Sequence, residues 1–393
     1  MSILISAKSI LPRRMPELDT LRGIAVLLVL FFHGFHLTPI HAAHPSAVTR
    51  LFLLVTAGGW SGVRLFFALS GFLITGILLD ARSSPRYYAD FYYRRALRIL
   101  PAYYLILIVL AVVSYLGIAD RRVGWPFLGL SAIYLANMTA FFGVVSQYSV
   151  LWSLAVEEQF YLLWPGVVRL FTQRGLLVVC AVLLIGCPSL RAYYYLHGYE
   201  AGAGYTWLVA DSLAGGAVLA ILVRGSLRSP KELGFVAIGV GIAAVAIFMA
   251  GIPYGIYLSR TMAGNVVRQT FLNLFFTTLV AAALALGSTR YGYLFRIRWL
   301  KFFGDISYGL YLIHMLTFDM VDHFGRRVVP WAYSTAQEFP TVVVRFLVGS
   351  GLSIALAYLS RWYFEERFLE LRDRAKSTPP VAIPTVEEQP AAS

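Results

Sequence analysis

One apolar segment carries the two side chains whose types and spacing best suggest chemistry. Residues 19–36 read DTLRGIAVLLVLFFHGFH, with Arg22 near the start and His33 near the end. In a helix, the interval from 22 to 33 returns both side chains to nearly the same face, roughly 16 Å apart along the axis. Ionisable groups inside a bilayer are costly and usually face a polar interior or a pathway. We therefore interpret His33 as the reactive centre.

A second polar group lies within another apolar segment, VLWSLAVEEQFYLLWP at residues 150–165. Ser153 and Glu157 share a helix face because they are spaced i and i+4, and Glu158 follows directly. A carboxylate beside an imidazole raises its basicity and fixes its tautomer, which suits general base catalysis. We expect Glu157 or Glu158 to meet His33 at a similar depth. The alternative is that both glutamates lie at the membrane interface and pair with arginines.

Two arginines are spaced for joint binding of an anion. Arg95 and Arg98, just before Pro101, project together from one helical turn. Guanidinium groups bind phosphates by bidentate contacts, so this pair could hold a phosphorylated molecule. The competing interpretation is that the pair belongs to an ordinary basic segment at the cytoplasmic membrane surface.

Other ionisable residues fall deeper in apolar segments or near the opposite helix ends. Arg64, Arg191 and Arg345 lie near the helix ends predicted to face outward. They either extend to the interface or border a site for an outward-facing anionic or sugar-bearing substrate. His314, within ISYGLYLIHML, lies near mid-membrane and is either functional or a satisfied core histidine.

Composition restricts the class of protein. Of the 393 residues, 59% are hydrophobic and 13% are charged, whereas a soluble domain has about 25% charged residues. The apolar blocks are of helix length and do not alternate, which predicts an all-α polytopic transmembrane helical bundle. The net charge of +13 is typical of basic cytoplasmic loops and does not indicate nucleic-acid binding. Cys180 and Cys187 lack the spacing of a disulfide framework or a metal site, so we expect no metal.

The hydrophobic pattern predicts about ten spans with both termini cytoplasmic. We expect them near residues 21–38, 60–80, 100–118, 150–170, 175–196, 206–223, 234–252, 269–287, 304–321 and 340–360.

Three further segments complete the predicted organisation. Residues 39–58 are expected to form a loop, and residues 127–142 either cross the membrane or re-enter it. If 127–142 does not cross, the basic clusters all lie on the side of the N-terminus, as the positive-inside rule favours. We expect residues 1–375 to form one membrane domain and 376–393, rich in Pro, Glu, Ser and Ala, a disordered cytoplasmic tail.

Five segments together resemble the acyltransferase 3 family of integral membrane acyltransferases. They are ELDTLRGIAVLLVLFFH (17–33), GVRLFFALSGFLITGILL (62–79), FYYRRALRILPAYY (91–104), LWSLAVEEQFYLLWP (151–165) and GDISYGLYLIHM (304–315). The family's Arg-x10-His pattern falls on Arg22 and His33, and its Arg-x-x-Arg pattern falls on Arg95 and Arg98. The segments occur in the family's order over nearly the whole chain.

The resemblance implies an enzyme of the bacterial inner membrane that takes an acyl group, usually acetyl, from cytoplasmic acyl-CoA. The implied acceptor is a hydroxyl of a carbohydrate or other molecule, often a cell-envelope or exported glycan. On this hypothesis Arg22, Arg95 and Arg98 bind the phosphates of CoA. His33 then accepts the acyl group or deprotonates the acceptor. Glu157 or Glu158 is expected to orient the imidazole. The residues expected to border the acceptor pocket are Arg64, Ser153, Arg191 and His314.

Two other classes of protein compete with this hypothesis. A transporter or flippase of a glycan or lipid-linked substrate would also explain many spans and buried ionisable residues. Against it, the chain lacks the paired half-repeats of many transporters. A scaffold or sensor without catalysis is disfavoured by the presence of Arg22, His33, Glu157, Arg95 and Arg98. Consumption of acyl-CoA by the purified protein separates these classes.

Overall fold

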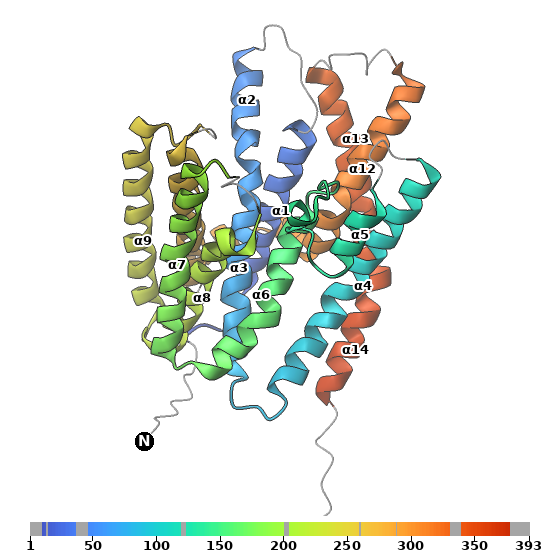
Figure 1. Ribbon diagram of the computed structural model, residues 1–393. Helices are drawn as coiled ribbons and strands as arrows, with labels where there is room; N and C mark the ends of the chain where they lie inside the picture. The colour runs from blue at the N-terminus through green and yellow to red at the C-terminus, as the bar shows by residue number, and fades with distance from the viewer. Residues whose placement is uncertain are drawn as a thin grey trace, which may run out of the picture.

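The chain folds into a bundle of long helices (Figure 1). This computed structural model describes residues 10–12, 15–36, 46–118, 123–199, 204–258, 261–287, 289–330 and 339–377. Within these ranges every regular element is helical. The all-α polytopic fold predicted from hydropathy is confirmed.

Fourteen α-helices follow one another in the described part of the chain. They are α1 (Pro16–His36), α2 (Ala47–Ala57), α3 (Gly62–Asp80), α4 (Tyr87–Leu116), α5 (Trp125–Ala132), α6 (Leu151–Leu170), α7 (Gln173–Leu196), α8 (Thr206–Gly225), α9 (Pro230–Gly251), α10 (Arg268–Gly287), α11 (Arg298–Asp305), α12 (Ser307–Val328), α13 (Phe339–Leu359) and α14 (Glu366–Ser377). A 3₁₀ turn, η1 (Gly58–Ser61), joins α2 to α3, and a π-helical turn, η7 (Ser360–Glu365), joins α13 to α14.

The long helices agree in position with the predicted spans. In the described part of the chain, 8 helical segments are long and apolar enough to cross a membrane. Helices α6 and α12 are not among them, and these are the helices that carry Glu157, Glu158 and His314. They have 20 and 22 residues and lie within the bundle (Figure 1). The number of spans and the side of the termini stay predictions.

Part of the predicted loop at 39–58 is helical. Helix α2 begins after Ser46, whose hydroxyl accepts a hydrogen bond of 3.1 Å from the amide of Thr49. This N-cap satisfies one of the amide groups that a helix leaves unpaired at its start. The apolar segment that follows continues through η1 into α3, so that one helical unit runs from 47 to 80. The expectation of a loop is therefore wrong for residues 47–57, and the helical unit begins earlier than the predicted span at 60–80.

The segment 127–142 does not cross the bundle. Helix α5 has 8 residues, a length of about 12 Å, and a hydrocarbon core is about 30 Å thick. Figure 1 shows α5 and the chain after it in the upper half of the molecule, beside α4. The side-chain amide of Gln159 on α6 donates hydrogen bonds to the Tyr134 carbonyl at 2.8 Å and to Asn137 at 3.0 Å. These bonds hold the segment against α6 without a crossing of the bundle, which is consistent with the ten-span prediction.

The backbones of helices α3 and α8 are in direct contact where the two helices cross. A side chain on Gly71 would overlap with the carbonyl of Leu213, and one on Gly216 would overlap with the carbonyl of Ala68. Small residues allow such close packing of helices in membranes, where dispersion contacts stabilise association. This crossing fixes the position of α3, which carries part of the site described below.

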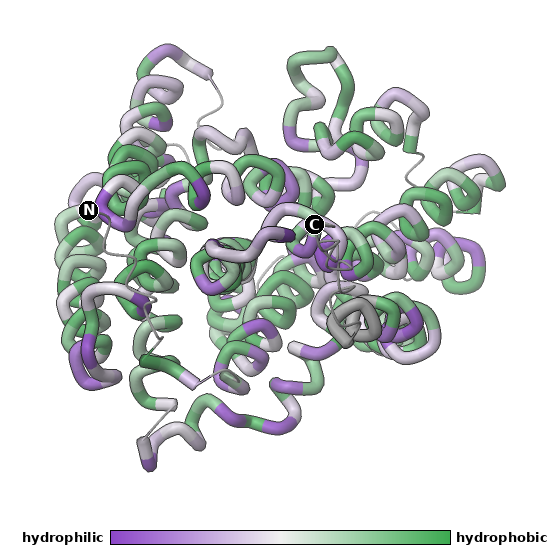
Figure 2. Tube along the Cα trace, turned by 90° about the horizontal axis from the view of Figure 1, so that it is seen from below, coloured by the Kyte–Doolittle hydropathy of each residue, from purple (hydrophilic) through white to green (hydrophobic). Residues whose placement is uncertain are grey.

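The two ends of the described chain lie on the same side of the bundle. Helix α1 begins in the lower part of the molecule and α14 ends at its lower end (Figure 1). Figure 2 shows the bundle from below, with hydrophobic residues along most helical turns and hydrophilic residues gathered at helix ends and connections. The predicted disordered tail lies outside the described residues beyond Ser377.

Candidate active site

A cavity of about 830 Å³, part of it open to solvent, lies between α1, α3, α4, α6 and α12. The structure thus brings together side chains that are far apart in the sequence. Six residues singled out from the sequence line this cavity: Arg22, Arg95, Arg98, Ser153, Glu157 and Glu158. Its other polar lining residues are Ser70, Tyr161, Ser307, Tyr308 and Tyr311.

The arginines lie in the part of the cavity nearest the lower end of the bundle, because Arg22 is near the start of α1 and Arg95 is near the start of α4. The Arg95 guanidinium lies 4.8 Å from the centre of the Tyr161 ring. Stacking on an aromatic face stabilises a cation and orients its planar fork of N–H donors. Arg22 lies 3.6 Å from the carboxylate of Asp19 on the same helix. This part of the cavity suits an anionic ligand.

Hydroxyl groups orient the carboxylate of Glu157. Ser70 on α3 donates a hydrogen bond of 2.8 Å to Glu157 Oε1. The Tyr161 hydroxyl has two acceptors within reach of its single proton, Ser70 Oγ at 3.0 Å and Glu157 Oε2 at 3.3 Å. Glu157 and Tyr161 share a face of α6 because they are spaced i and i+4. Glu157 and Glu158 both line the cavity, and the expectation that one of them orients His33 stays a prediction.

The imidazole of His33 is held by His314. His33 Nδ1 lies 2.8 Å from His314 Nε2, and the two ring centroids are 4.9 Å apart with the planes 28° from parallel. His314 Nδ1 in turn lies 3.1 Å from the carbonyl oxygen of Leu310, one turn earlier on α12. His314 has a relative exposure of 1%. The sequence indicated each histidine separately but gave no signal that they pair.

Tyr311 connects the cavity with the histidine pair. Its hydroxyl is 2.5 Å from Ser153 Oγ, and both residues line the cavity. The centre of its ring is 5.9 Å from the centre of the His314 ring. His33 and His314 themselves lie beyond Tyr311 and outside the cavity lining. The site thus has an arginine-bearing part, a wall with carboxylates and hydroxyls, and a histidine pair on the far side.

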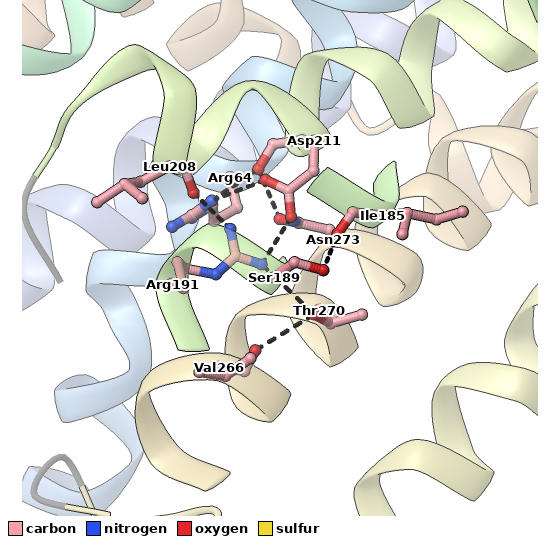
Figure 3. A network of polar contacts seen from close by, with 10 residues as sticks. Arg64, Ile185, Ser189, Arg191, Leu208, Asp211, Val266, Thr270 and Asn273 are labelled. Carbon is pink, nitrogen blue, oxygen red and sulfur yellow. Dashed lines mark hydrogen bonds and ion pairs between the residues drawn. The ribbon is translucent and has the colours of Figure 1, made fainter. Parts of the chain in front are cut away.

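Arg64 and Arg191 lie in a separate buried network (Figure 3). Arg191 donates a hydrogen bond of 2.7 Å to Asp211 Oδ2, and Arg64 lies 3.8 Å from Asp211 Oδ1. Arg64 also donates to Ser212 at 2.9 Å, and Ser212 donates to Asn273 at 2.6 Å. The relative exposures of Arg64, Arg191 and Asp211 are 6%, 1% and 1%.

These two arginines do not line the cavity, and they do not extend to the interface. The physical reason is the carboxylate of Asp211, which sequence reasoning did not use. A buried charge requires a partner, and Asp211 on α8 provides one for Arg64 on α3 and for Arg191 on α7. A lone aspartate in the predicted span 206–223 was the signal that could have found this network.

Arg345 on α13 connects the two helices that carry the histidines. Its Nη2 donates a hydrogen bond of 2.8 Å to Asp322 on α12, and its Nη1 donates one of 2.9 Å to the carbonyl of Gly34 on α1. Gly34 leaves room for the rings of Phe346 and Phe318, which a side chain there would overlap. The arginine is buried. This contact fixes the backbone next to His33 relative to α12.

The described residues contain no group of His, Cys, Asp and Glu side chains that could hold a metal ion. Cys180 and Cys187 are both buried free thiols. The side chains at the site carry imidazole, carboxylate, hydroxyl and guanidinium groups.

A polytopic helical bundle with an arginine-bearing cavity near a histidine pair defines a multi-pass membrane protein with a basic internal cavity. The family model described as "Acyltransferase domain" matches residues 15–362. The chain belongs to this family, the acyltransferase 3 family, and the resemblance seen in its sequence motifs is confirmed.

Two relatives show what the chain is similar to. The "Putative peptidoglycan O-acetyltransferase YrhL" of Bacillus subtilis (strain 168) is 30% identical over 335 residues, which cover 77% of this chain and 48% of the relative. The "Peptidoglycan O-acetyltransferase OatA" of Listeria monocytogenes is 27% identical over 333 residues, which cover 76% of this chain and 48% of the relative. The chain thus spans about half the length of these relatives. No solved structure matches it significantly.

Proposed function

We propose that this chain transfers an acyl group, most simply acetyl, from acyl-CoA to a hydroxyl of a cell-envelope glycan. Membership of the acyltransferase 3 family supports acyl transfer. The names of the two relatives support acetyl as the group and a glycan as the acceptor. The observation that carries the proposal is the cavity, which has three arginines in one part and approaches a histidine pair through Tyr311.

The donor fits the arginine-bearing part of the cavity. CoA carries phosphate groups at one end and the thioester at the end of a long, narrow arm. Arg22, Arg95 and Arg98 supply guanidinium groups, which bind phosphate oxygens in bidentate geometry. The arm then extends towards Tyr311, and Glu157, oriented by Ser70, accepts hydrogen bonds from its amide groups.

His33 is the group proposed to perform the transfer. In one route its imidazole removes the proton of the acceptor hydroxyl, whose oxygen attacks the thioester carbonyl. The C–S bond breaks, and the CoA thiolate takes the proton. In the other route His33 attacks the thioester carbonyl first, and the C–S bond breaks to release the CoA thiolate. The acceptor oxygen then takes the acyl group from the imidazole, the acyl–nitrogen bond breaks, and the proton of the acceptor hydroxyl passes to the thiolate. The arginine-bearing end faces the cytoplasm of a bacterial cell in this proposal, because acyl-CoA is made there.

The test uses purified full-length protein in nanodiscs with radiolabelled acetyl-CoA, with and without cell-envelope glycans. Release of the CoA thiol and transfer of label are measured for wild type, His33→Ala, Arg95→Ala and Arg94→Ala. Arg94 is the matched control, since it neighbours Arg95 but its guanidinium donates to the Asp90 carbonyl at 2.8 Å. We expect His33→Ala to be inactive and Arg94→Ala to equal wild type.

The outcomes separate the candidate functions. Label on the protein without acceptor, dependent on His33, supports the acyl-histidine route. CoA release that requires both His33 and glycan supports the direct route. If folded wild-type protein consumes no acetyl-CoA, with or without glycans, the proposal is contradicted. That result favours transport of a glycan or lipid-linked substrate.

A further inference from the structure

Two hydrogen bonds determine which nitrogen of His314 carries its proton. The carbonyl oxygen of Leu310 can only accept a hydrogen bond, and His314 Nδ1 lies 3.1 Å from it. His314 Nδ1 is therefore protonated. The other ring nitrogen, Nε2, faces His33 Nδ1 at 2.8 Å.

The burial of His314 determines the direction of the second bond. A proton on Nε2 as well would make this residue an imidazolium with a relative exposure of 1%, and burial of a charge inside a bilayer carries a large free-energy cost. His314 is therefore neutral, and its Nε2 accepts. It follows that His33 Nδ1 donates, which leaves the proton-accepting lone pair of His33 on Nε2.

The turn of α12 that carries His314 is hydrogen-bonded to a side chain from another part of the chain, Tyr148. The Tyr148 hydroxyl donates a hydrogen bond of 2.6 Å to the Leu312 carbonyl and accepts one of 3.2 Å from the Leu316 amide. These two backbone groups are the i and i+4 pair on either side of His314. A hydroxyl inserted at such a pair fixes the local shape of a helix. The bond from Arg345 to Gly34 fixes α1 on the other side of the histidine pair.

We propose that His314 is a positioning residue, which holds His33 in the tautomer with the proton on Nδ1 so that Nε2 is the reactive nitrogen. This inference rests on the proposed function, in which His33 performs the transfer. It differs from the role expected from the sequence, where His314 was assigned to the acceptor pocket. The role resembles that of the hydrogen-bond partners of metal-binding histidines, which fix the tautomer of the imidazole and whose removal costs about 10–100-fold in metal affinity or activity.

The kinetic test compares His314→Phe with His314→Gln. Phenylalanine fills the site but accepts no hydrogen bond, whereas the glutamine amide oxygen can accept one near the position of Nε2. We expect His314→Phe to lower kcat by about 10–100-fold with an unchanged KM for acetyl-CoA. His314→Gln is expected to recover a large part of that loss. A residue with only a packing role would show no such rescue.

His197→Phe is the matched control. His197 makes the same local contact, from Nδ1 to the carbonyl four residues earlier, at 2.8 Å. It lies exposed at the end of α7, remote from the cavity lining. We expect this variant to equal wild type in kcat. A His314→Phe protein with wild-type kcat, or a His314→Gln protein as impaired as His314→Phe, would overturn the inference.

A second measurement does not need turnover. In protein labelled with ¹⁵N-histidine, the imidazole shifts report which ring nitrogen is protonated, and the His33 signals are those missing from His33→Gln. We expect wild-type His33 to be protonated at Nδ1 and the His314→Phe variant to show a changed tautomer ratio. Protonation of wild-type His33 at Nε2 alone contradicts the inference, even where the protein transfers no acyl group. The failure of this inference and of the proposed function are therefore distinguishable.

Discussion

The Arg345 guanidinium donates a hydrogen bond to the carbonyl of Gly34, the residue after His33, while it pairs with Asp322. One side chain of α13 thereby sets the distance between α1 and α12, and with it the distance between the two histidines. The relationship is independent of the cavity, so it can be tested by stability as well as by activity.

We expect Arg345→Met to destabilise the protein by about 3 kcal/mol, at the lower end of the cost of breaking a buried ion pair, because it leaves the half-buried carboxylate of Asp322 without its cation. The double variant Arg345→Met, Asp322→Leu is expected to recover most of the stability but not the activity, since the bond to Gly34 stays absent. Unfolding in mixed micelles and acetyl transfer are the two measurements. Full activity of a folded double variant would show that this contact does not position His33.

Arg95→Ala is expected to raise the KM for acetyl-CoA by about tenfold or more with a smaller change in kcat. The reason is the loss of a charge-assisted hydrogen bond, worth about 1.5–3 kcal/mol, in binding of the donor. Initial rates over a range of acetyl-CoA concentrations measure both constants. Arg94→Ala should leave them unchanged, and equal effects of the two variants would argue against a donor site at Arg95.

Asp211→Asn should destabilise the bundle by about 3–5 kcal/mol, since it leaves Arg64 and Arg191 as buried cations without a carboxylate. Asp305→Asn is the matched control, because Asp305 pairs with Lys301 at the surface, where such pairs contribute about 0–1 kcal/mol. The two variants are compared by thermal unfolding in the same detergent. A similar small effect of both would mean that the buried network does not hold α3, α7 and α8 together.

Ser70→Ala should reduce kcat/KM for acetyl-CoA by about tenfold, which corresponds to loss of one hydrogen bond to a charged group. The expected cause is that Glu157 loses the donor at 2.8 Å that orients its Oε1 atom. Ser70→Thr keeps a hydroxyl and is expected to keep more of the activity. If Ser70→Ala retains the wild-type value, the orientation of Glu157 is not needed for use of the donor.

Much of the fold could be predicted because membrane helices are visible as long apolar segments. The placement of Arg22 and His33 on the same helix could be predicted from the helical period alone. Arg95 and Arg98 were predicted to act together for the same reason, and both line the cavity. These inferences depend on local geometry, which the sequence specifies directly.

The contacts between helices could not be predicted in the same way. His33 and His314 are separated by 281 positions, and their pairing depends on how α1 and α12 are rotated and shifted against each other. The Tyr148 hydroxyl, inserted beside the backbone of α12, follows no pattern in the sequence. Asp211 was different, because an isolated carboxylate in the predicted span 206–223 itself predicts a buried cation nearby.

The bonds that run from His33 through His314 end at the Leu310 carbonyl, an oxygen that does not take up a proton at physiological pH. A proton that His33 takes on Nε2 therefore has no exit through this chain and must leave from the same atom. In the proposed reaction that proton passes from the acceptor hydroxyl to the CoA thiolate, as the acyl group passes from CoA to the acceptor. In this reaction one proton moves inward for each acyl group that moves outward, so no net charge crosses the membrane. The reaction is then electrically silent, and a membrane voltage would neither drive it nor oppose it.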